Sequence, residues 1–81
     1  MTVSLIDLPY LIELVSRDIK ELNATIENEN TPEELRDYCG ELLMAALRTA
    51  GNLQNQYTSE WTNGCNLPNY NELIIEIERR I

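Results

Sequence analysis

Residues 5–26 read LIDLPYLIELVSRDIKELNATI, and their apolar side chains recur in alternating steps of three and four. The resulting stripe consists of Leu5, Leu8, Ile12, Val15, Ile19, Leu22 and Ile26. This period places the stripe on one face of an α-helix that packs against other helices. Leu11 and Leu14 lie beside the stripe and widen it, so we expect more than one neighbouring helix to cover this face.

The ends of this first helix follow from its flanking residues. Asp7 is a suitable N-cap and Pro9 is tolerated in the first turn, so Leu5 should be an apolar flank just outside the helix. Asparagines and like charges in the segment ENEN at 27–30 favour a turn. These signals predict a helix over about residues 8–27.

A second helix is predicted from Thr31-Pro32-Glu33-Glu34, the most specific local signal in the chain. Threonine would cap the helix, proline would take the first helical position, and Glu34 would complete a capping box. Apolar residues then continue at helical spacing past Gly51, so we expect the helix to span about residues 32–60 rather than break there. Asn63-Gly64 supplies the stop or a tight turn.

The last helix is predicted over about residues 70–80, with Asn69 as N-cap and Glu72 three positions later. Three isoleucines within 72–78 also suit a strand, but the capping signal favours the helix. Short connections imply antiparallel neighbours. The sequence therefore predicts one all-α domain over 1–81: a long antiparallel helical hairpin with a short third helix at the C-terminal end.

Composition limits the function classes. The chain has 81 residues and a net charge of −8, which opposes binding to nucleic acid and to anionic membranes. The longest apolar run, 42–47, is too short to span a bilayer, and the first residues lack the basic region of a signal peptide. We therefore expect a cytoplasmic protein whose two cysteines are free thiols.

Residues with catalytic chemistry are scarce. The sequence has no histidine and no glycine-rich phosphate loop, and two thiols alone do not complete a zinc site. An EF-hand loop starting at Glu27 would place Pro32 at its sixth position and Tyr38 at its twelfth, so it fails. Cys39 should pack in the core, and nothing near Cys65 in sequence lowers its pKa. We predict no enzymatic activity, no cofactor and no metal.

The apolar stripe on the first helix is about three heptads long, whereas the third helix has fewer than two heptads. The third helix cannot cover the whole stripe, so part of the stripe should be free for another chain. A second copy is the simplest partner, because two-fold dimers are the commonest oligomers. Tyrosine and tryptophan near helix ends suit either an interface or the closure of a small core. The predicted partner-binding residues of this self-associating adaptor, regulatory or scaffold module are Leu11, Ile12, Val15, Ile19, Tyr57 and Trp61.

The alternative hypothesis is a small acidic inhibitor that mimics nucleic acid and binds a basic protein groove. Its binding surface would be the acidic cluster around the first bend, which consists of Glu27, Glu29, Glu33, Glu34 and Asp37. Acids at the start of a helix also have a plain structural reason, since they complement the helix dipole.

Overall fold

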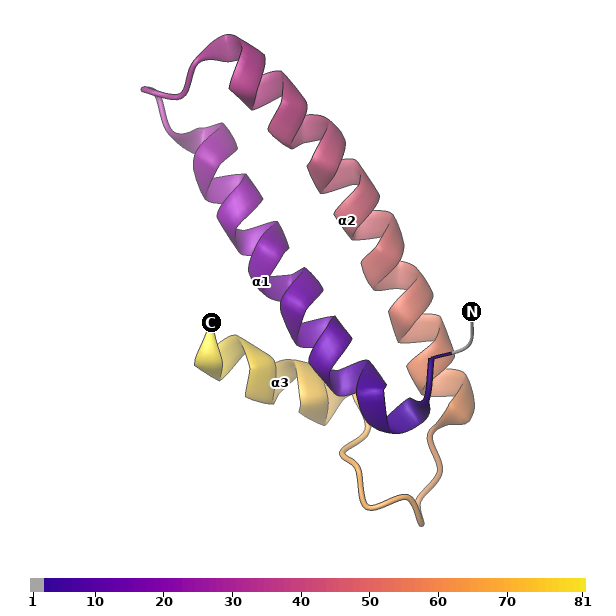
Figure 1. Ribbon diagram of the computed structural model, residues 1–81. Helices are drawn as coiled ribbons and strands as arrows, with labels where there is room; N and C mark the ends of the chain where they lie inside the picture. The colour runs from indigo at the N-terminus through magenta and orange to yellow at the C-terminus, as the bar shows by residue number, and fades with distance from the viewer. Residues whose placement is uncertain (1–2) are drawn as a thin grey trace.

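The computed structural model describes residues 3–81. A short 3-10 helix, η1 (Leu5–Asp7), leads into α1 (Leu8–Glu27), which is followed by α2 (Glu33–Glu60) and α3 (Tyr70–Arg80). α1 and α2 lie side by side in opposite directions, and α3 crosses the half of the hairpin where α1 begins (Figure 1). The structure confirms the predicted all-α fold, a long helical hairpin with a short third helix.

The stripe of α1 packs inward along its whole length. Leu8, Ile12 and Leu22 are buried, and the other four members of the stripe are half-buried. Both α2 and α3 contact α1, which explains why its apolar face is wider than a simple heptad seam. No member of the stripe is exposed.

The N-cap of α1 is at the predicted residue but lacks the predicted side-chain bond. Asp7 is at the N-cap position, but its side chain makes no capping hydrogen bond. Its backbone is already helical because η1 precedes it, and its N–H donates to the carbonyl of Ser4 at 3.0 Å. Leu5, predicted as a flank, lies within η1 and packs against the core.

The capping box predicted at Thr31 is wrong. Pro32 is the N-cap of α2 and no side chain caps this helix. The Thr31 hydroxyl instead donates to the carbonyl of Thr25 at 2.7 Å, and Arg36 Nη2 donates to the carbonyl of Asn28 at 3.0 Å. Because these side chains satisfy carbonyls at the end of α1, they tie the two helices together and leave the start of α2 uncapped.

α2 continues through Gly51 without a break, as predicted. It ends at Glu60, and the N–H of Trp61 donates to the carbonyl of Tyr57 at 2.9 Å. A turn at Asn63-Gly64 follows, but the left-handed backbone position is Asn66, with φ of 60°. Asparagine tolerates this conformation better than most residues.

The capping box of α3 is confirmed. Asn69 Oδ1 accepts from the N–H of Glu72 at 2.9 Å, and the Glu72 carboxylate accepts from the N–H of Asn69 at 3.4 Å. Arg79 and Arg80 lie in the last turn, where cations complement the helix dipole.

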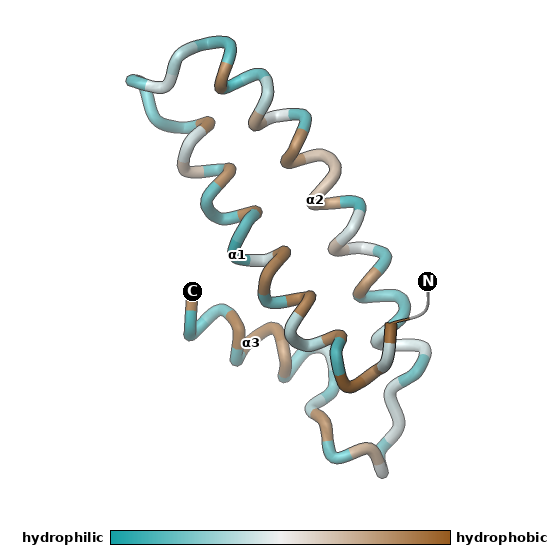
Figure 2. The backbone as a smooth tube through the Cα atoms, in the orientation of Figure 1, coloured by the Kyte–Doolittle hydropathy of each residue, from teal (hydrophilic) through white to brown (hydrophobic). Residues whose placement is uncertain are grey.

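The main core lies where the three α-helices meet. It consists of Leu8, Ile12, Tyr57, Leu73 and Ile77. Toward the α1–α2 bend the structure consists of α1 and α2 alone. Of the described residues 3–81, only Leu22 and Cys39 are buried there. Hydrophobic residues nevertheless recur along the whole of both helices (Figure 2).

Candidate protein-binding surface

Three apolar residues of α2 lie on one exposed face. Leu35, Tyr38 and Leu42 are 46%, 58% and 40% exposed, and we call them the α2 stripe. Their spacing of three and four places them next to one another on the helix surface. Cys39 follows Tyr38 by one residue, about 100° around the helix, and is buried. The α2 stripe therefore flanks the buried face of α2.

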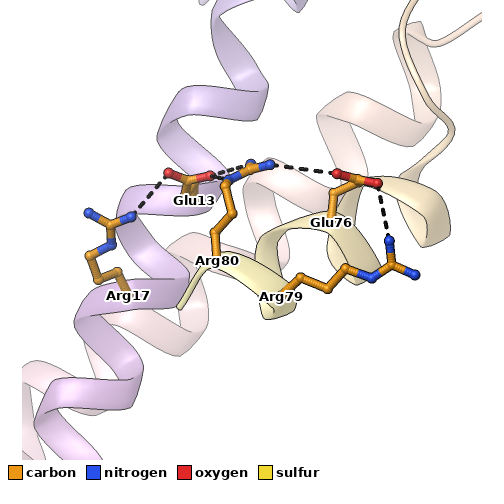
Figure 3. Close-up of polar contacts among 5 residues, drawn as sticks. All are labelled: Glu13, Arg17, Glu76, Arg79 and Arg80. Atoms are coloured by element: carbon orange, nitrogen blue, oxygen red, sulfur yellow. Dashed lines mark hydrogen bonds and ion pairs between the residues drawn. The ribbon is translucent and has the colours of Figure 1, made fainter.

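Polar contacts hold α3 away from the α2 stripe. The Glu13 carboxylate binds Arg80 of α3, and it also accepts from Arg17 Nη2 at 3.2 Å (Figure 3). Glu76 pairs with both Arg79 and Arg80, with N–O separations of 3.8 and 3.7 Å. These contacts fix α3 across the first half of α1, so α3 leaves the other half of the hairpin uncovered.

The predicted partner-binding residues lie mainly inside the chain. Ile12 and Tyr57 belong to the core, while Leu11, Val15 and Ile19 are half-buried. They therefore offer little surface in the isolated chain. Exposed apolar side chains lie instead in the α2 stripe, on η1 and α1 at Ile6, Tyr10 and Leu14, and singly at other positions. The single positions are Met44, Leu47 and Ile75.

The aromatic residues at the end of the hairpin close the core. The Tyr57 hydroxyl donates to the carbonyl of Pro68, and its ring centroid lies 6.4 Å from that of Tyr70. The half-buried Trp61 donates from Nε1 to the carbonyl of Leu67 at 2.8 Å. These bonds hold the α2–α3 loop against the core, so both predicted aromatic residues have a structural role.

The acidic cluster at the bend is exposed at every one of its five positions: Glu27, Glu29, Glu33, Glu34 and Asp37. Among residues 3–81, no three acidic or cysteine side chains converge in a way that could hold a metal ion. The nearby Arg36 turns its guanidinium to backbone carbonyls. The carboxylates of the cluster are thus presented to solvent.

Charge on α2 is segregated along the helix. Residues 33–41 carry four acids and Arg36, whereas residues 42–59 carry a single charge, Arg48. Arg48 is exposed and makes no ion pair within residues 3–81. Leu35 and Tyr38 of the α2 stripe lie in the acidic half, and Leu42 lies at its border with the nearly neutral stretch 42–59.

The two cysteines differ in environment. Cys39 is buried between the helices, as predicted, and Cys65 is half-buried in the α2–α3 loop. Burial favours the neutral thiol of Cys65, but hydrogen bonds from the backbone at Thr62, Leu67 and Cys65 itself outweigh it and lower the pKa. The expectation that nothing perturbs Cys65 was wrong, because backbone donors leave no trace in residue types.

Comparison with known protein families, curated proteins and solved structures gave no significant match. Within residues 3–81, the helices lack the combination of length and hydrophobicity needed to traverse a bilayer.

Proposed function

We propose that this chain is a protein-interaction module that associates with a second copy of itself through the α2 stripe. The observation that carries this proposal is the exposure of Leu35, Tyr38 and Leu42 side by side on one helix. Burying an exposed leucine or tyrosine side chain in an interface is favourable by about 25 cal/mol per Å² of apolar surface. A contiguous apolar face rimmed by charges is typical of an association site.

The area available matches a dimer. A compact protein of 9.4 kDa has an accessible surface of about 5,000 Å², whereas this chain has 5946 Å². The excess of about 900 Å² is close to the roughly 800 Å² that each partner buries in a standard interface. Its radius of gyration, 14.7 Å, also exceeds the roughly 12 Å of a compact chain of this length.

The extra surface reflects the flat, elongated shape of the molecule. The molecule measures 48 × 29 × 14 Å, so its smallest dimension is little more than one helix diameter. A second hairpin laid on the half toward the α1–α2 bend would convert two helices into four, the number that encloses the core of a four-helix bundle. Because α3 does not reach the bend, the second copy would complete the core in that half of the hairpin.

Sedimentation equilibrium over a wide concentration range tests the proposal. We expect a monomer–dimer equilibrium for the natural chain, and a dissociation constant raised at least tenfold in the variant L35Q/Y38Q/L42Q. The matched control is Met44→Gln, which removes an exposed apolar side chain from another side of α2. A natural chain that stays monomeric at millimolar concentration would overturn the proposal, as would equal effects of both variants.

A second candidate is the acidic inhibitor, which is supported by the exposure of all five carboxylates at the bend. Binding through them would be fast and would weaken steeply with salt. A pull-down from a cell extract in low and high salt separates the two candidates. Capture of basic nucleic-acid-binding proteins only at low salt, and its loss when Glu33, Glu34 and Asp37 are neutralised, would favour the inhibitor.

A further inference from the structure

We infer that the two copies pair through α2 in antiparallel orientation, so that Arg48 of each copy lies opposite the acidic half of α2 in the other. This inference rests on the proposed self-association and adds its geometry. It follows from two features of α2, the segregation of its charges and the gradient of side-chain size along its exposed face.

The charges of α2 decide between the two orientations. A parallel pair would place Glu33, Glu34, Asp37 and Glu41 of one copy beside the same four acids of the other. Like charges in register cost free energy, the more so when they border a desolvated interface. An antiparallel pair places these acids beside residues 42–59 of the other copy, whose single charge is positive.

Arg48 is well placed for this role. Glu34, Glu41 and Arg48 are spaced seven residues apart, so they lie on one side of α2. Each precedes a position on the face of the α2 stripe by one residue, which is where flanking charges set orientation in paired helices. Arg48 is exposed, and it has no ion partner within the described residues 3–81.

Side-chain size favours the same orientation. The face that carries Leu35, Tyr38 and Leu42 continues at the same spacing with Ala45 and Thr49, and both are exposed. An antiparallel copy centred near Leu42 sets the large residues of one chain against the small ones of the other. Large side chains set against small ones interdigitate. A parallel pair would place large side chains opposite large ones and leave a gap at Ala45 and Thr49.

Charge reversal with sedimentation equilibrium tests the orientation. In an antiparallel dimer centred near Leu42, Arg48 of one copy lies closest to Glu34 of the other. The variants Arg48→Glu and Glu34→Lys each place like charges at this contact, so each variant alone should dimerise about tenfold more weakly than the natural chain. An equimolar mixture of the two should form a heterodimer at near-natural affinity, because both sets of opposite charges are restored. The loss of dimer affinity in each single variant should be smaller in 1 M salt, where exposed charges are screened.

Two controls make the outcomes decisive. Arg79→Glu changes the net charge as Arg48→Glu does, but on α3, and should leave the dimer within about twofold of the natural affinity. Circular dichroism checks that each exposed substitution leaves the helices intact. A parallel dimer would give no weakening for either α2 variant, which would overturn the inference while leaving self-association in place. A monomeric natural chain would overturn both.

Discussion

The Glu13 carboxylate, in the second turn of α1, accepts a hydrogen bond from Arg80 Nε at the end of α3, with an N–O distance of 2.8 Å. This bond joins residues 67 positions apart in the chain. Glu13 also binds Arg17 on its own helix, and Arg80 also pairs with Glu76 on α3. This charged network adds to the packing of Leu73 and Ile77 in the core, and together they hold α3 across α1.

Replacing Arg80 with glutamine should therefore destabilise the fold more than the same change at Arg79. Arg79 is the more exposed of the two, and among residues 3–81 it pairs only with Glu76, within its own helix. Exposed ion pairs contribute about 0.2–1 kcal/mol, so we expect a midpoint lowered by roughly 2–6 °C for Arg80→Gln and by less than about 2 °C for Arg79→Gln. Thermal unfolding followed by circular dichroism measures both. Equal shifts would show that the link to α1 contributes nothing.

Among the tyrosines, loss of the hydroxyl group at Tyr57 should lower the stability of the fold the most. Its side chain is fully buried and its hydroxyl donates to the carbonyl of Pro68, so Tyr57→Phe leaves a carbonyl without its donor. We expect a loss of about 1–2 kcal/mol in the free energy of unfolding, measured with urea. Tyr10→Phe is the control, since Tyr10 is exposed and lies outside the α2 stripe, and should change it by less than about 0.5 kcal/mol. A loss at Tyr57 no greater than at Tyr10 would argue against a structural role for this bond.

The helical fold was predictable because its signals are local. Heptad spacing on α1 and the Asn69–Glu72 capping box each involve residues a few positions apart, and both patterns appear in the structure. The Thr31 cap failed for the opposite reason. The Thr31 hydroxyl donates to the carbonyl of Thr25 on α1 instead of capping α2. Which of these two bonds forms depends on the path of the chain through the α1–α2 bend, which residue types alone do not specify.

The candidate surface was harder to predict because exposure depends on where α3 lies. Sequence spacing identifies Leu35 and Leu42 as apolar positions of α2 without saying whether a neighbour covers them. Burial of Leu73 and Ile77 in the core, together with the bond from Arg80 to Glu13, keeps α3 at the other end of the hairpin. The same tertiary placement turns Ile12 and Tyr57, predicted as interface residues, into core residues.

Gly51 offers a stabilising substitution. It lies in the interior of α2, it is exposed, and a Cβ built there meets no atom within 4 Å. Gly51→Ala should raise the free energy of unfolding by about 0.5–1 kcal/mol, because glycine loses more backbone freedom in a helix than alanine does. Gly64→Ala is the control: it is equally free of clashes but lies in the loop, where no helix propensity is gained. A destabilised Gly51→Ala variant would indicate that this turn of α2 is packed against another molecule.

The two thiols should react at very different rates. Cys39 is buried, so alkylating reagents should reach it only when the hairpin opens, whereas Cys65 is half-buried in the loop and part of it faces solvent. Hydrogen bonds at Thr62 and Leu67 lower the pKa of Cys65, which increases its thiolate fraction at neutral pH. Since the thiolate is the reactive form, we expect iodoacetamide to label Cys65 at least tenfold faster than Cys39, as measured by mass spectrometry of the peptides.

The pH dependence of that labelling tests its cause. The lowered pKa means that the rate at Cys65 should rise with pH and reach half of its plateau below the pH at which an ordinary cysteine does so. Thr62→Val removes a side-chain donor and should move this midpoint upward, toward that of the unfolded chain. Denaturation in urea should bring both cysteines to one common profile. A midpoint for Cys65 that is the same in the folded and unfolded chain would contradict stabilisation of the thiolate by the loop.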